Sequence, residues 1–111
     1  MAEEAEKGWI GVDFDGTLAF YDEWRGPMHT GPAIRPMLER VRQWLSEGKR
    51  VKIFSCRGND EEGRAAVHMW LVEHGLPKLE VTCTKDWYMI ELWDDRCVQL
   101  KPNTGKRVDG N

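Results

Sequence analysis

The sequence predicts a single α/β domain built on a mostly parallel sheet. Apolar runs of strand length, near residues 8–14 and 51–56, alternate with stretches of helical periodicity near 35–47 and after residue 59. Strands that alternate with helices form parallel sheets with right-handed crossovers. The chain has 111 residues, which is enough for one hydrophobic core and too short for two.

The first half of the chain is expected to contain one strand, one irregular excursion and one helix. Residues 8–14 are apolar on both faces, so this strand is predicted to be central. Residues 18–33 mix glycine and proline with aromatic and charged residues, which indicates an irregular excursion. A helix is predicted over 35–47, with Pro36 in its first turn and Gly48 at its end.

The second half continues with a strand over 51–56 and a second helix. Asn59 is predicted to cap this helix, Glu62 to complete the reciprocal cap, and Gly75 to end the helix. Further short strands are expected near 79–83, 89–94 and 97–100.

Composition and charge limit the compartment and the partners. No apolar stretch approaches the roughly 20 residues of a membrane helix. Residues 1–7 are polar and do not form a secretion signal. We expect these residues to be frayed and flexible. Cys56, Cys83 and Cys97 match no disulfide or zinc pattern, so we expect buried free thiols in a reducing cytosol. The net charge of −3 argues against a stable nucleic-acid complex. We therefore expect a cytoplasmic protein without membrane binding; its oligomeric state is not predicted.

Two carboxylates, Asp13 and Asp15, stand at the end of the first predicted strand. Side chains two residues apart on a strand point to the same side, and two such negative groups repel unless a cation or a proton lies between them. The pair therefore indicates a metal site, a proton-transfer task, or both. A turn or helix cap is the alternative, because aspartate often supplies one. Ser55 and the doublet Asp94-Asp95 also end predicted strands, so all these residues are expected at one edge of the sheet.

The run Asp13-Phe14-Asp15-Gly16-Thr17-Leu18 resembles the first motif of the haloacid-dehalogenase-like (HAD) hydrolases. The other motifs of that family follow in order: an apolar run that ends in Ser55, then Lys85, then an acidic motif over 90–96. The resemblance covers roughly residues 8–100. It implies a three-layer Rossmann-like fold with strand order 3-2-1-4-5. The excursion over 18–33 would be a flap, too short for a folded cap, so 8–111 is expected to be one cap-less catalytic domain.

The resemblance also implies a role for each motif residue. Asp13 would be the nucleophile that forms an aspartyl-phosphate, and Asp15 the general acid and base; Ser55 and Lys85 complete the catalytic set. The implied phosphate-binding residues are Gly16, Thr17, Ser55, Cys56, Arg57 and Lys85. The implied metal ligands are Asp13, Asp15 through its carbonyl, Asp94 and Asp95. Mg²⁺ is the expected ion because these ligands are all hard oxygens. Asp95 is the preferred direct ligand, with Asp94 acting through water.

Several residues near these motifs keep two interpretations. Arg57 would grip a phosphate or be a solvated loop arginine. Arg96 would contact the substrate or pair with the acidic doublet. Trp24 would stack on a base or pack within its loop. His29 is expected close to where substrate enters.

The function that the resemblance implies is an Mg²⁺-dependent phosphomonoester hydrolase. An open crevice would admit large phosphorylated substrates such as nucleotides, nucleic-acid ends or phosphoproteins. The alternative from another class is a phosphate- or partner-binding module on the same fold with little turnover. A phosphatase domain that works with a nucleic-acid kinase is a third hypothesis, and it predicts a preference for 3′-phosphate ends.

Overall fold

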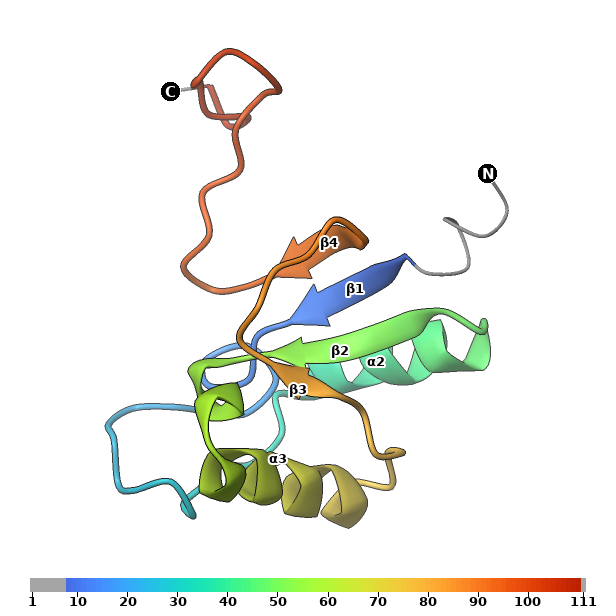
Figure 1. Cartoon of the computed structure of the whole chain (residues 1–111), viewed down its shortest axis with the longest axis vertical. Coiled ribbons are helices and arrows are strands. Elements are labelled where there is room, and N and C mark those ends of the chain that lie inside the picture. The colour runs from blue at the N-terminus through green and yellow to red at the C-terminus, as the bar shows by residue number, and fades with distance from the viewer. Residues whose placement is uncertain (1–7, 111) are drawn as a thin grey trace.

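The computed structural model describes residues 8–110 and shows a parallel sheet of four strands in the order β3-β2-β1-β4 (Figure 1). The strands are β1 (Trp9–Val12), β2 (Arg50–Phe54), β3 (Val81–Thr82) and β4 (Met89–Trp93). The predicted α/β class and the central place of the first strand are therefore confirmed. The fraying predicted for residues 1–7 lies outside the described residues.

One face of the sheet carries the hydrophobic core. Ile10 pairs with Val51 and Val12 with Ile53, so these alternate residues point to the same face. All four belong to a buried cluster that also contains residues of both helices. Because the two crossovers β1 to β2 and β2 to β3 run in the same direction along the sheet, right-handed connections place both helices on this face.

Helix α2 (Arg35–Ser46) ends within one residue of its predicted end. Pro36 lies in its first turn, where a missing N–H leaves no hydrogen bond unmade. Gly48 follows with a φ of +79°, a left-handed conformation that glycine adopts without steric penalty. The helix buries Met37, Leu38 and Val41 against the sheet.

Helix α3 (Glu61–Glu73) begins differently from the prediction. Residues Cys56–Asn59 form a 3₁₀ turn, η1, and the cap is Asp60, whose carboxylate accepts a 2.7 Å hydrogen bond from the Gly63 N–H. The predicted cap was therefore wrong by one residue, because the extra turn uses Asn59; its side chain accepts from the Cys83 thiol instead. No helix within residues 8–110 is long and apolar enough to cross a membrane.

The opposite face of the sheet has no helix on it in the described chain, so the predicted third layer is not found. Residues 83–88 connect β3 to β4 without a helix, because six residues are too few for a helical crossover. Side chains cover this face instead. The Trp9 indole donates a 2.8 Å hydrogen bond to Asp86, and the Lys52 ammonium lies 4.6 Å from the centroid of the Trp9 ring.

The predicted fifth strand, 97–100, is also absent from the described residues. Figure 1 shows the segment after β4 extending away from the sheet to a turn near the C-terminus. In that segment Leu100 forms only an isolated bridge, to Arg107. The Asp94 carboxylate accepts a hydrogen bond from the Arg96 N–H, which turns the chain immediately after β4. The observed order is therefore 3-2-1-4 and not 3-2-1-4-5.

The expectation of buried thiols was wrong. All three cysteines are exposed free thiols. Cys56 and Cys83 come just after β2 and β3, and Cys97 lies beyond the turn that follows β4. The apolar residues that precede each cysteine in the sequence belong to a strand. That strand ends before the cysteine, so the cysteine itself lies outside the core.

Residues 18–33 form the irregular excursion that was predicted, and we call this segment the flap. Its base is attached firmly to the domain. The Phe20 N–H donates to the Pro32 carbonyl at 2.8 Å, and the buried Trp70 indole donates to the Gly31 carbonyl at 2.8 Å. The flap extends from this base beyond the carboxyl ends of β1 and β2 (Figure 1).

Candidate functional site

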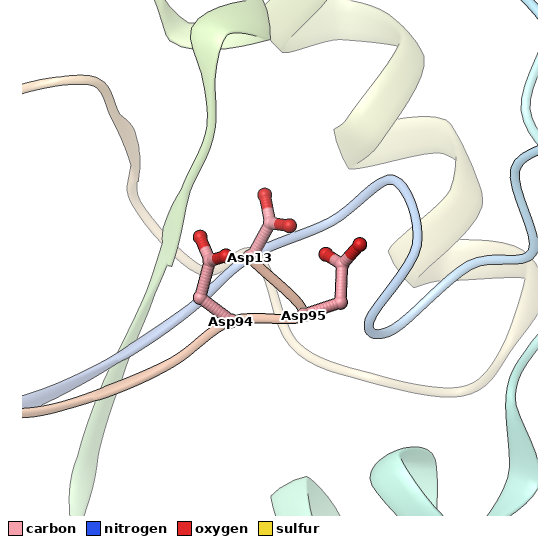
Figure 2. Close-up of side chains that lie close together, drawn as sticks. All are labelled: Asp13, Asp94 and Asp95. Carbon is pink, nitrogen blue, oxygen red and sulfur yellow. The ribbon is translucent and has the colours of Figure 1, made fainter. Parts of the chain in front are cut away.

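Three carboxylates meet at the carboxyl ends of β1 and β4 (Figure 2). Asp13 follows β1, and Asp94 and Asp95 follow β4. One oxygen atom from each carboxylate lies within 4.8 Å of the others. The Asp13 N–H donates to the Trp93 carbonyl at 2.9 Å, which holds the two strand ends together. Residues distant in sequence thus place three oxygens close enough to share one cation.

The electrostatics of the acidic cluster favour an added positive charge. Burial, a hydrogen bond with Asp95 and the charges of Asp94 and Asp95 together raise the pKa of Asp13 from its usual 3.8 to about 7. Burial acts in the same direction on Asp95, but hydrogen bonds from Asp13 and Thr17 outweigh it and lower the pKa of Asp95. Oxygen ligands alone, in a cluster with excess negative charge, fit Mg²⁺ by donor type and charge.

Gly16 and Thr17 position the acidic doublet. Gly16 has a φ of +92°, and a Cβ atom there would lie only 2.7 Å from the Asp95 carboxylate. Glycine therefore permits both the turn after Asp13 and the close approach of Asp95. The Thr17 hydroxyl lies 3.0 Å from Asp95 Oδ1 and 3.4 Å from Asp13 Oδ2. These two residues support the acidic side chains from the side away from the cleft described next.

A cleft of about 550 Å³ opens beside the acidic cluster. Asp13, Asp15 and Asp94 line it, together with Ser55 and Cys56 from the end of β2. Ser55 is buried, and its oxygen accepts a 3.1 Å hydrogen bond from the Arg57 N–H. This bond uses a lone pair and leaves the hydroxyl hydrogen for an acceptor in the cleft. The cleft therefore contains a hydroxyl donor as well as the carboxylate of Asp13.

The structure contradicts one of the two predicted roles of Arg57, which lines the cleft, and its phosphate-binding role stays a prediction. Its side chain is only 5% exposed, so it is not a solvated loop arginine. Its Nε and Nη2 atoms donate to the two oxygens of Asp15 at 2.7 and 3.1 Å. The Nη1 atom donates to the Pro27 carbonyl at 2.6 Å, and Nη2 donates also to the His29 carbonyl at 2.9 Å. Four hydrogen bonds to the protein leave little of the guanidinium for a phosphate.

Other predicted residues lie outside the cleft. Lys85 is exposed and is not among the residues that line it. Gly16 and Thr17 face the far side of Asp95, in a separate depression. The phosphate-binding roles of these three residues stay predictions. His29 contributes its backbone carbonyl to Arg57 and not its imidazole.

The cleft also contains residues that the sequence did not single out as functional. Tyr21 and Asp60 line it, as do Trp24 and Arg96, for each of which a substrate contact was one of two predicted roles. Asp60 combines this place with its role as the cap of α3. The available signal for Tyr21 was its position in the flap, three residues before Trp24.

The chain matches no protein-family model, no curated protein sequence and no solved structure.

Proposed function

We propose that this protein is an Mg²⁺-dependent phosphomonoester hydrolase of the small, cap-less HAD type. The observation that carries the proposal is the convergence of Asp13, Asp94 and Asp95 within 4.8 Å of one another, beside a cleft that Asp13 and Asp94 line. Carboxylates this close are stabilised by a cation or a proton between them, and the cleft provides room for a substrate. The alternative of a turn or helix cap explains neither the shared location nor the raised pKa of Asp13.

In the proposed phosphate hydrolysis, Asp13, Asp15 and Ser55 each have one task. The Asp13 carboxylate attacks phosphorus in line, and the bond between phosphorus and the leaving oxygen breaks. Asp15 gives its proton to the leaving alkoxide, and later takes a proton from the water that hydrolyses the aspartyl-phosphate. The Ser55 hydroxyl donates to a phosphate oxygen. Mg²⁺, held by Asp13, Asp94 and Asp95, would supply positive charge to the phosphate oxygens and to the carboxylates.

The size of the cleft supports a proposal on the substrate class. Its volume of about 550 Å³ is in the range of pockets that bind small molecules, so we propose a nucleotide or a phosphorylated nucleic-acid end. Trp24 is 57% exposed and Tyr21 is 37% exposed, and both line the cleft, where a ring could stack on them. A panel of nucleotides, sugar phosphates and DNA ends with 3′- or 5′-phosphates distinguishes these substrates and tests a partnership with a nucleic-acid kinase.

The decisive experiment measures phosphate release from an aryl phosphate with and without Mg²⁺. Asp13→Asn should lower turnover by at least ~1,000-fold, the scale of losing a nucleophile. Asp109→Asn, the same change in the exposed C-terminal segment, is the matched control and should keep full activity. Full activity of Asp13→Asn would exclude Asp13 as the nucleophile.

A second candidate function, a phosphate-binding module with little turnover, is favoured by one observation. Lys85, the lysine of the implied catalytic set, lies outside the cleft. Fluoroberyllate with Mg²⁺ should raise the melting temperature in either case, because both would bind a phosphate analogue. Only the enzyme releases phosphate. A melting shift without release would establish the binding module.

A further inference from the structure

The flap tip, residues 21–30, depends on one side chain for its attachment. In the described part of the chain, every hydrogen bond between the tip and the rest of the protein is donated by Arg57, to the Pro27 and His29 carbonyls. The other hydrogen bonds of the tip stay within it, such as those from Arg25 to Asp22. The tip is mostly exposed, so it has few buried apolar contacts to hold it.

The same guanidinium also holds Asp15. Two of its N–H groups form a fork with the Asp15 carboxylate at 2.7 and 3.1 Å. Its carbon lies 5.5 Å from the ring centroid of Phe14 and 5.2 Å from that of Trp24, which belongs to the tip. A guanidinium is planar and rigid, so its donors move together. A shift of the flap tip therefore either carries this fork with it or breaks the two carbonyl bonds that brace the guanidinium.

We infer that Arg57 is a positioning residue that couples the seating of the flap tip to the orientation of Asp15. The catalytic consequence rests on the proposed function, but the coupling itself does not. When the tip is seated, Arg57 is held from both sides and Asp15 is fixed in the cleft wall. When the tip lifts, Arg57 loses its carbonyl partners, and Asp15 loses its fixed orientation. Substrate entry past the flap is thereby linked to assembly of the acid/base.

Limited proteolysis tests the coupling without an activity assay. Trypsin can cut after Arg25 in the tip, and cleavage after Lys106 or Arg107 in the exposed C-terminal turn provides an internal reference. Arg57→Lys keeps the charge but loses the fork and at least one carbonyl bond. Cleavage after Arg25 should rise by ~10-fold relative to the reference, because the tip loses at least one hydrogen bond from a charged donor.

Asp15→Asn provides the second half of the test. If Asp15 and the tip share Arg57, this variant should also raise cleavage after Arg25, and the double variant should add less than the sum of the two single effects. Arg64→Lys is the matched control. The Arg64 side chain donates a 2.7 Å hydrogen bond to the nearby Gly58 carbonyl and forms no hydrogen bond with Asp15 or the flap in the described residues. Equal cleavage in Arg57→Lys and wild type, or strictly additive effects, would overturn the coupling.

Kinetics with an aryl phosphate separate positioning from substrate contact. Arg57→Lys should lower kcat by at least ~10-fold with KM changed less than about threefold, since the lost interaction orients Asp15 and binds no phosphate. A raised KM with unchanged kcat would identify Arg57 as a substrate ligand and overturn the inference. If wild-type protein releases no phosphate, the proposed function fails, and the proteolysis cycle still decides the coupling.

Discussion

Thr17 and Asp95 are hydrogen-bonded to each other twice. The Asp95 N–H donates to Thr17 Oγ1 at 3.0 Å, and the Thr17 hydroxyl donates to Asp95 Oδ1, also at 3.0 Å. The loop after β1 thereby fixes both the backbone and the side chain of a residue that follows β4. Loss of a group that orients a metal-binding carboxylate typically lowers metal affinity or activity by about 10- to 100-fold.

Replacement of Thr17 tests this reciprocal pair. Thr17→Val removes the hydroxyl at nearly constant shape, so Asp95 loses a donor and an acceptor, and the Mg²⁺ affinity should fall by ~10-fold. Thr17→Ser keeps the hydroxyl and should retain most of the affinity. Isothermal calorimetry with Mg²⁺ measures both. Equal affinity in Thr17→Val and wild type would show that Thr17 does not orient the cluster.

Gly16 offers a test with a matched partner. Gly16→Ala places a Cβ atom 2.7 Å from Asp95 Oδ2 in a residue with a φ of +92°, whereas Gly48→Ala at +79° meets no atom within 4 Å. Both variants should lose ~1–2 kcal/mol of unfolding free energy from the backbone conformation. Only Gly16→Ala should also weaken Mg²⁺ binding, because Asp95 must move. Urea unfolding and a Mg²⁺ titration of each variant separate the two effects, and a normal Mg²⁺ affinity in Gly16→Ala would contradict the prediction.

The sequence predicted the parts of this protein that local patterns determine. β1, α2 and the flap follow from apolar runs, helical spacing and clustered glycine and proline, and the ends of β1 and α2 were predicted to within two residues. The strand ends then located Asp13, Asp94 and Asp95, because parallel strands align their carboxyl ends. The acidic cluster is therefore a consequence of strand order and could be anticipated.

The remaining features depend on contacts that no local pattern encodes. The cap of α3 moved to Asp60 because an extra 3₁₀ turn precedes the helix. The segment 97–100 has a strand-like composition, but the turn at Asp94 directs it away from the sheet. The partners of Arg57 lie in the flap and on Asp15, and only the folded chain brings them within reach of its guanidinium.

The raised pKa of Asp13 predicts how stability depends on pH without a divalent cation. A carboxyl group whose pKa is about 7 in the folded protein and near 3.8 when unfolded binds more protons in the folded state between these values. The contribution of Asp13 to the free energy of unfolding therefore falls as pH rises from about 4 to about 7. The lowered pKa values of Asp22 and Asp86 act in the opposite direction, at lower pH.

Urea unfolding in EDTA across pH 4–8 measures this dependence. The difference in unfolding free energy between wild type and Asp13→Asn isolates Asp13 from the other carboxylates, and wild type should lose stability relative to the variant as pH rises. Mg²⁺ should reverse the loss, with a larger melting shift at pH 8 than at pH 5.5, because the ion competes with the proton. A flat difference between the two proteins would show that Asp13 titrates normally.

The exposed thiols provide a direct check on the position of the cleft. All three cysteines should react with a disulfide reagent in the native protein, since each is exposed. Of the three cysteines, only Cys56 lines the cleft. Mg²⁺ with fluoroberyllate should therefore slow the alkylation of Cys56 by ~10-fold or more, and mass spectrometry identifies the modified cysteine. Cys97, in the segment beyond β4, lines a different depression and serves as the internal control. Equal protection of Cys56 and Cys97 would indicate general stabilisation of the fold, and no protection of Cys56 would place the phosphate analogue outside this cleft.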